Sequence, residues 1–302
     1  MAGRRTGSHR APTPGPLPGR GRRPDVRALR DTWPRGPVEI ATGTVEVVPD
    51  PDHAAGATLM VNGVPSSYLD LEDPGVLAFE YMQQMALVVD VLRPGDPLDV
   101  VHLGAAGCAL ARALDWVRPG SRQVAVELDT SLPELVRTWF ALPRSPALRI
   151  RAGDARAELA RMPDASADVV VRDVFAGATT PAHVTTVEMV RDVARVLRPG
   201  GVYLVNCADG CALTRARSEA ATLADVFADV AAVAEPSLLR GRGYGNVVLA
   251  ASDDPDLLAV AGLARAVRSL PAPARLLRGD ELRALVGAAP VLRDPGSTKG
   301  SP

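Results

Sequence analysis

The sequence predicts an α/β fold in which a doubly wound, mainly parallel sheet follows a small antiparallel β unit. Between residues 98 and 206, short runs of β-branched residues alternate regularly with segments of helical periodicity, as in sheets covered by helices on both faces. Ahead of this region, Asn62-Gly63 joins two β-rich segments and is a dipeptide that favours a tight hairpin turn. The chain has 302 residues and is 47% hydrophobic, enough for one such core with a small appendage.

Composition excludes several classes of partner. The net charge of −1 gives no overall attraction to nucleic acid or membranes, and no run approaches the roughly 20 apolar residues of a membrane span. The cysteines, Cys108, Cys207 and Cys211, lack CxxC spacing, which argues against a disulfide framework and against zinc. The N-terminus carries no apolar secretory core. We therefore expect a cytoplasmic protein that binds no metal, nucleic acid or membrane.

Four parts are expected along the chain. Residues 1–36 are rich in Arg, Pro and Gly, with almost no bulky apolar side chains, and predict a disordered tail. Residues 37–72 form the antiparallel β unit and residues 73–252 the large α/β domain. Residues 253–302 predict a C-terminal helical extension whose last ten residues are frayed.

The expected elements follow in order. After the β unit, Asp73 serves as the N-cap of a helix with Pro74 in its first turn, which ends at Pro94-Gly95. The strands of the large sheet are expected at 98–103, 123–128, 148–151, 167–171, 202–206 and 246–250. The helices between and after them are expected at 107–117, 132–140, 155–162, 186–197 and 218–227.

Ligands in doubly wound sheets bind at the carboxyl ends of the strands. The first candidate there is the loop containing Gly104, Ala105 and Gly107, which leaves the first strand of the large sheet and opens a helix. Its small residues allow a ligand close to the backbone, and the helix N-terminus offers free N–H groups. The same glycines would also serve a tight turn without any ligand.

Acidic residues follow the next two strands. Glu127 ends the second strand, 23 residues after Gly104, where a carboxylate can accept hydrogen bonds from both hydroxyls of a ribose; Asp129 is the neighbouring candidate. Asp154 and Ala155 follow the third strand, where the carboxylate can accept from an adenine amino group. The alternatives are a surface charge at Glu127 and a helix N-cap at Asp154.

These pieces together resemble a known superfamily. The runs GAAG, VELD, GDA, VVVRD and LRPGG occur in this order within residues 98–206, and they resemble class I S-adenosylmethionine-dependent transferases. Within that superfamily the chain is similar to the spermidine synthases, or polyamine aminopropyltransferases, over residues 38–250. A small β unit precedes their Rossmann-like domain too. The segment VNGVPSSYLDLEDPGVLAFEYMQ resembles their linker, with its Gln and DExxYxE pattern, and PAHVTTVEM resembles their LYTxEF helix start.

The resemblance implies a donor and a base. It implies that S-adenosylmethionine or its decarboxylated form is bound as donor, and that Asp173, which matches the first Asp of the family's DxxD loop, takes the proton of an attacking amine. Read without the resemblance, Asp173 would also serve as a loop cap. His183 is a further candidate for proton transfer, whereas His102 lies inside a strand and is expected in the core.

The chain departs from the family where the amine would bind. Ala176 replaces the second acid of DxxD, and Gly107 replaces the Asp of the family's glycine loop. When Glu80 is aligned with the last acid of DExxYxE, Ala78 falls at the tyrosine, and Ser66 stands roughly at the Gln. Glu80 and Ser66 are therefore the substrate-binding candidates.

Three hypotheses remain open. The first is a transferase of an aminopropyl or related alkyl group to an unknown acceptor. The second is a non-catalytic homologue, and the third is a methyltransferase with an unrelated acceptor; a nicotinamide dehydrogenase is more distant. Edge strands in residues 37–71 invite pairing with a second copy, so we expect a homodimer.

Overall fold

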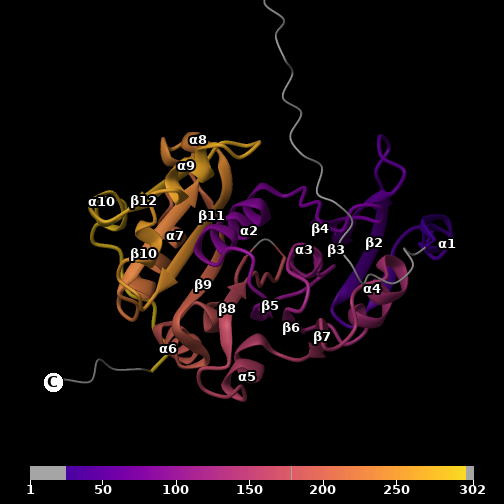
Figure 1. Cartoon of the computed structure of the whole chain (residues 1–302), viewed down its shortest axis with the longest axis horizontal. Coiled ribbons are helices and arrows are strands. Elements are labelled where there is room, and N and C mark those ends of the chain that lie inside the picture. Colours follow the sequence, from indigo (N-terminus) through magenta and orange to yellow (C-terminus); the bar gives the residue numbers. More distant parts are fainter. Residues whose placement is uncertain (1–24, 178, 297–302) are drawn as a thin grey trace, which may run out of the picture.

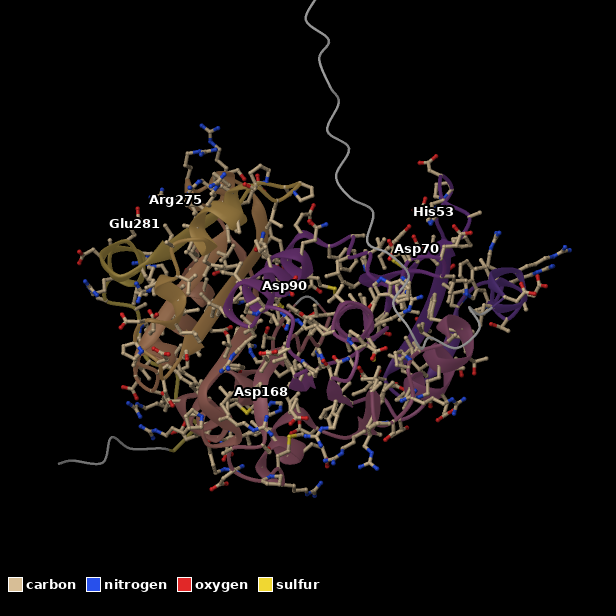
Figure 2. The ribbon with its side chains drawn as sticks, in the orientation of Figure 1. His53, Asp70, Asp90, Asp168, Arg275 and Glu281 are labelled. Carbon is tan, nitrogen blue, oxygen red and sulfur yellow. The ribbon has the colours of Figure 1, made fainter. Side chains whose placement is uncertain are left out.

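The structure is a computed structural model that describes residues 25–177 and 179–296. It contains a four-stranded antiparallel sheet and an eight-stranded mixed sheet, shown in Figure 1 with the small sheet to the right of the large one. The predicted fold class, a doubly wound Rossmann-like sheet with a small antiparallel unit before it, is confirmed. Figure 2 places the His53–Asp70 pair at the small sheet, with His53 in the loop between β2 and β3, and the Arg275–Glu281 pair at the opposite end of the molecule.

The small sheet is a meander in the order β1-β2-β3-β4. Its turn at Asn62-Gly63 has positive φ at both residues, 51° and 76°, which suits a type I′ hairpin and confirms that prediction. The β3–β4 register shifts between Leu59 and Met60, so that Leu59 faces Ser67 while Met60 faces Pro65, and Ser66 is left without a partner. The strands are β1 (Val38–Ile40), β2 (Gly43–Pro49), β3 (Gly56–Val61) and β4 (Val64–Asp70).

The large sheet has the order β12-β10-β11-β9-β8-β5-β6-β7. The strands from β9 to β7 run parallel, whereas β11, β10 and β12 join by antiparallel pairs. Two of these strands, β10 and β12, were not predicted. The strands are β5 (Asp99–Leu103), β6 (Arg122–Glu127), β7 (Leu148–Ala152), β8 (Ala167–Arg172), β9 (Leu197–Gly210), β10 (Asp229–Ala234), β11 (Tyr244–Ser252) and β12 (Arg275–Arg278).

Helices cover both faces of this sheet. One apolar cluster joins α2, α3, α4 and α9 to one face, and a second joins α5, α6, α7 and α10 to the other. None of the helices in the described ranges is long and apolar enough to cross a membrane. The helices are α1 (Val26–Arg30), α2 (Glu80–Leu92), α3 (Ala109–Val117), α4 (Leu132–Phe140), α5 (Ala155–Ala160), η1 (Ala182–Val184), α6 (Val187–Val196), α7 (Thr214–Ala224), α8 (Pro236–Leu239), η2 (Leu257–Ala259), α9 (Leu263–Arg268) and α10 (Asp280–Val286).

The structure corrects the start of the first long helix. Asp73 is not an N-cap: its Oδ1 accepts a hydrogen bond from the N–H of Gly75 at 2.9 Å, which closes a turn, and α2 begins only at Glu80. The helix expected at 218–227 is α7, which begins at Thr214 and ends at Ala224.

Both ends of the described chain are more ordered than predicted. In the expected tail, Asp25 caps α1, and the indole of Trp33 donates to the carbonyl of Trp139 at 3.0 Å; residues 1–24 lie outside the described residues. Within the expected helical extension, β12 pairs with β10. Asp294 binds both terminal nitrogens of Arg156, so the expected fraying is wrong at that residue, and residues 297–302 lie outside the described residues.

Candidate active site

The carboxyl ends of four parallel strands meet at one edge of the large sheet. Leu103 of β5 lies between Val126 of β6 and Arg172 of β8, and Glu127 lies beside Ala152 of β7. The structure therefore brings the glycine loop after β5, Glu127, Asp154 and Asp173 to the same edge, as the strand order predicts.

Gly104 lets the loop pass against the end of β8. Its φ is +88°, and a Cβ at this position would lie 2.2 Å from the carbonyl oxygen of Asp173. The N–H of Asp173 donates to the carbonyl of Leu103 at 2.8 Å, which locks the two segments together. Farther along, Ala106 and Cys108 hold φ values of 43° and 56°, a left-handed conformation that side chains adopt at a cost. The loop is therefore held in one specific shape against Asp173.

The N–H groups of this loop are all engaged by the chain itself. Oε2 of Glu127 accepts from Ala105 at 3.2 Å and from Ala106 at 2.8 Å, while Oε1 accepts from the N–H of Asp129 at 3.0 Å. The next N–H, of Gly107, donates to Oγ of Ser67 in β4 at 3.0 Å. Glu127 and the small sheet thus fix the loop from two sides.

Asp129, the neighbouring candidate beside a nucleoside, is engaged by the chain itself, and its expected role stays a prediction. Only 1% of the residue is exposed. One oxygen accepts from the N–H and the hydroxyl of Thr42, and the other from the N–H groups of Ser131 and Leu132. Four hydrogen bonds satisfy the carboxylate, which therefore ties the small sheet to the start of α4.

Asp154 is the N-cap of α5 and accepts from the N–H of Ala157 at 2.9 Å. Its second oxygen lies 2.9 Å from Nε2 of His183, so His183 stands beside this acid and not beside Asp173. Burial acts to raise the pKa of Asp154, but the hydrogen bonds from Ala157 and His183 outweigh it and hold that pKa below its usual value. Ala155, the first residue of α5, is buried. The N–H of Gly153 donates to the carbonyl of Glu127 at 2.8 Å, which keeps the two acids on adjacent strand ends.

Asp173 lies deepest in the site. Its Oδ2 accepts from the hydroxyl of Tyr81 at 2.8 Å, and its Oδ1 accepts from Nδ2 of Asn206 at 2.8 Å. Burial raises the pKa of Asp173 above its ordinary value, against the opposing effect of these two donors. A partly buried carboxylate with a raised pKa and free lone pairs is suited to accept a proton.

Two predicted substrate residues do not reach this carboxylate by any hydrogen bond. Glu80 is exposed at the start of α2, and the next residue, Tyr81, contacts Asp173 in its place. The hydroxyl of Ser66 donates to the carbonyl of Val64, whereas Ser67 points to the glycine loop. Both differences are shifts by one position, which on a strand or helix turns the side chain to another face.

Sequence reasoning missed Tyr81, Asn206 and Ser67. Tyr81 was overlooked because Glu80 was aligned with the last acid of the family's DExxYxE pattern. The tyrosine directly after Glu80 was the signal that could have identified it. Asn206 ends the predicted strand next to that of Asp173, so its place at the sheet edge was visible in the strand order. His102 lies in the core as expected, and burial lowers its pKa to about 4.

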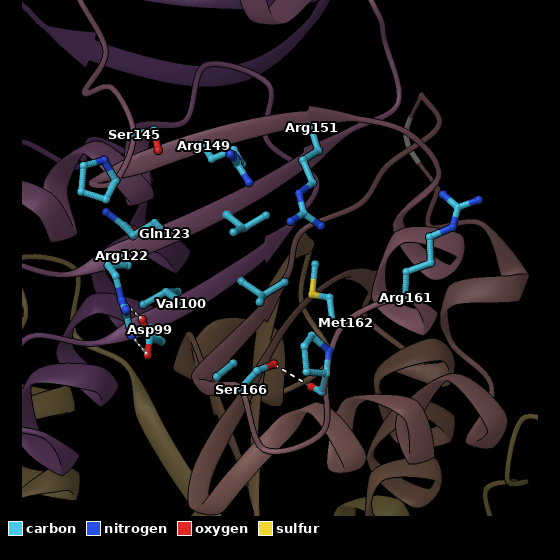
Figure 3. Close-up of a pocket in the computed structure, with 15 residues that line it drawn as sticks. Asp99, Val100, Arg122, Gln123, Ser145, Arg149, Arg151, Arg161, Met162 and Ser166 are labelled. Carbon is cyan, nitrogen blue, oxygen red and sulfur yellow. Dashed lines mark hydrogen bonds and ion pairs between the residues drawn. The ribbon is translucent and has the colours of Figure 1, made fainter.

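Two cavities differ in position and size. A cavity of about 30 Å³, enough for a water molecule, reaches Asp173, Gly104 and Met82. A groove of about 370 Å³ lies at the other ends of β5, β6 and β7 and includes Arg122 and Arg149 among its lining residues (Figure 3). Because ligands of such sheets bind at the carboxyl ends of the strands, the smaller cavity marks the candidate active site. Glu127, beside the glycine loop, is half-exposed.

Comparison with known proteins agrees with the fold described above. A family model described as a methyltransferase domain matches residues 101–205. A polyamine aminopropyltransferase of Chromobacterium violaceum is 30% identical over 141 residues, which cover 46% of this chain and 53% of that protein. The match thus spans about half the length of the curated relative.

Solved structures extend the likeness over most of the chain. A probable spermidine synthase from Corynebacterium glutamicum shares 36% identity, with a TM-score of 0.80 over 88% of this chain and 99% of that one. The spermidine synthase from Thermotoga maritima, at 15% identity and a TM-score of 0.57 over 83% of this chain and 87% of that one, shows a similar fold. Fold and comparisons define an S-adenosylmethionine-dependent type of transferase. Within that class, the chain belongs to the spermidine synthase-like family.

Proposed function

We propose that the chain transfers an aminopropyl group from decarboxylated S-adenosylmethionine to an amine. The observation that carries this proposal is Asp173, a partly buried carboxylate at the end of β8 that accepts hydrogen bonds from two donors and lies against the glycine loop. Such a group can orient an amine and accept its proton close to a donor bound on that loop.

The reaction needs little more than placement and proton transfer. The sulfonium of the donor makes its adjacent carbon electrophilic, and the nitrogen of a neutral amine attacks this carbon. A C–N bond forms as the C–S bond breaks, its electron pair returns to sulfur, and methylthioadenosine leaves. Asp173 takes the proton that the nitrogen loses and passes it to solvent.

We assign the binding of the donor's nucleoside to three groups at the carboxyl ends of the parallel strands. Glu127 would accept from the ribose hydroxyls, because each of its oxygens retains acceptor capacity beside its present hydrogen bonds. Asp154 would accept from the adenine amino group. The turn of Gly104, Ala105 and Gly107 supplies a surface without bulky side chains.

The hydrogen bonds of the loop favour a donor without a carboxylate. The N–H groups of Ala105, Ala106 and Gly107 are already bonded to Glu127 and Ser67, so none is free for the α-carboxylate of S-adenosylmethionine. The negative charge of Glu127 would also repel that group. This supports the decarboxylated donor, and methyl transfer from the intact one is the competing outcome.

Mass analysis of products tests the proposal. The protein is incubated with either donor and a mixture of amines; we expect aminopropylated amine and methylthioadenosine from the decarboxylated donor only. Asp173→Asn should lower the rate at least 100-fold, while Asp164→Asn, a change in an exposed residue, should leave it unaltered. Methylated products would instead identify the protein as a methyltransferase. No product with either donor would favour a non-catalytic homologue.

We also propose that two copies associate through the small sheet. The described strand order leaves β1 and β4 as its edges, and Val48 and Val64 are 41% and 38% exposed on this sheet. Sedimentation equilibrium should give twice the chain mass for the wild type. A monomeric mass at all concentrations would contradict the homodimer.

A further inference from the structure

Two amide side chains that are almost fully buried, Gln84 in α2 and Asn206 in β9, each have a carbonyl oxygen without a hydrogen-bond partner among the described residues. Asn206 is 1% exposed and its Oδ1 is unbonded; Gln84 is 5% exposed and its Oε1 is likewise unbonded. Buried carbonyl oxygens nearly always accept a hydrogen bond, so each exception calls for an explanation. A ligand N–H would supply the missing partner.

The orientation of Asn206 is set by its neighbour. Its Nδ2 donates to Oδ1 of Asp173, and an ionised carboxylate can only accept, so the Asn206 carbonyl oxygen must point elsewhere. Gln84 follows Tyr81 by three residues in α2, and residues at this spacing lie on the same helix face. Since Tyr81 donates to the other oxygen of Asp173, the carboxylate lies between the elements that carry the two amides.

We call Tyr81, Gln84, Asp173 and Asn206 the acceptor cluster: Tyr81 and Asn206 contact Asp173 directly, and Gln84 is assigned to it by its spacing from Tyr81 in α2. It holds one carboxylate and two neutral oxygens that lack a donor. Asp209, the next acid along β9, is not counted in the cluster, because its two oxygens are engaged by the N–H groups of Gly210 and Ala216. The cluster therefore offers one negative charge and additional neutral acceptors.

We propose that the acceptor is a primary monoamine with an apolar chain, held through its nitrogen by Asp173, Asn206 and Gln84; this rests on the proposed function. A primary ammonium has three N–H donors, which match one carboxylate and two amide oxygens. The single positive charge of this ammonium is offset by the single negative charge of Asp173. A diamine would bring a second ammonium that the cluster leaves without a carboxylate, and a buried unpaired charge is strongly disfavoured.

Aromatic rings near the cluster suit an apolar chain. Phe79 stacks on Tyr81 with ring centroids 6.1 Å apart, and Phe175, two residues after Asp173, is 37% exposed. When Asp173 removes one proton, the two amide oxygens retain the remaining N–H groups. The lone pair that is released can then attack the donor carbon.

Calorimetry on the full chain tests this inference. Methylthioadenosine is titrated first, and the loaded protein is then titrated with 1-aminobutane or 1,4-diaminobutane, which differ only in the second amine. We expect 1-aminobutane to bind at least tenfold more tightly. Gln84→Glu, which adds a second carboxylate, should reverse the preference, whereas Ala78→Glu, which adds the same charge at an exposed residue before α2, should not.

The outcomes separate the two proposals. If methylthioadenosine fails to bind, the proposed function is wrong and the acceptor assignment falls with it. If methylthioadenosine binds but 1,4-diaminobutane binds the wild type as tightly as 1-aminobutane or more so, only the acceptor assignment is overturned. An unchanged preference in Gln84→Glu that retains methylthioadenosine binding would remove Gln84 from the cluster.

Discussion

The hydroxyl of Tyr81 lies 2.8 Å from Oδ2 of Asp173 and donates a hydrogen bond to it across 92 residues of sequence. This contact joins α2 to the end of β8 and places a phenol against the carboxylate that we assign as the base. The Asn206 amide donates to the other oxygen, so a hydrogen bond holds each oxygen of the Asp173 carboxylate.

Tyr81→Phe should shift the pH dependence of the reaction. The Tyr81 hydrogen bond lowers the pKa of Asp173, so its loss raises a pKa that burial already raises. Because a base acts in its deprotonated form, the acidic limb of kcat/KM should move to higher pH. Tyr68→Phe removes a similar 2.8 Å contact with Asp50 in the small sheet and is the matched control. Superimposable profiles for wild type and Tyr81→Phe would contradict the assignment.

Asp173→Asn should stabilise the fold while it abolishes activity. The folded-state pKa of Asp173 is raised, so its favourable contribution is present at low pH and is lost as pH rises through that pKa. At pH 7 the partly buried charge is therefore a cost, and the isosteric amide should raise the free energy of unfolding. Urea unfolding at pH 4 and pH 7 measures this difference, which should shrink at the lower pH. A variant less stable than wild type at pH 7 would show that the charge is well compensated.

Gly104→Ala should damage both fold and site. The added Cβ would meet the Asp173 carbonyl oxygen at 2.2 Å, and the φ of +88° is itself unfavourable for alanine. We expect a loss of about 2 kcal/mol or more in unfolding free energy. Gly262→Ala, where nothing lies within 4 Å of the new Cβ, should change stability far less. Equal effects of the two changes would mean that the loop can move away from β8.

Ser67→Ala should differ sharply from Ser66→Ala. Ser67 accepts from the buried N–H of Gly107, and its loss leaves that donor unsatisfied, at about 1–3 kcal/mol. Ser66 bonds only to the carbonyl of Val64 two residues away, and its truncation should be nearly neutral. Thermal unfolding of the two neighbouring variants gives the comparison. A larger effect at Ser66 would restore the original sequence-based choice.

The parallel part of the sheet was predictable because each of its strands is buried on both faces. Val169, Val170 and Val171 are all buried, which is why β8 reads as a continuous apolar run. The strand β10 gives no such signal, since half of its six residues are alanine, which has no β preference. Its assignment depends on the pairs it makes with β11 and β12.

The site was predictable to the level of strand ends but not of individual side chains. Glu127, Asp154 and Asp173 follow strands whose ends are aligned by the sheet, so their shared edge comes from topology alone. The choice between Ser66 and Ser67 depends on the irregular register between β3 and β4, and that between Glu80 and Tyr81 on where α2 begins. Such one-residue differences are decided by tertiary packing, and local sequence patterns carry no information about that packing.

The most direct test of this account is the affinity of the chain for methylthioadenosine, measured by calorimetry on wild type, Glu127→Ala and the exposed control Glu134→Ala. We predict saturable binding by the wild type and the control, and an affinity lower by about tenfold or more in Glu127→Ala, which loses charged hydrogen bonds to the ribose. Absence of binding by the wild type, or equal binding by all three proteins, would contradict a nucleoside site at the ends of these strands.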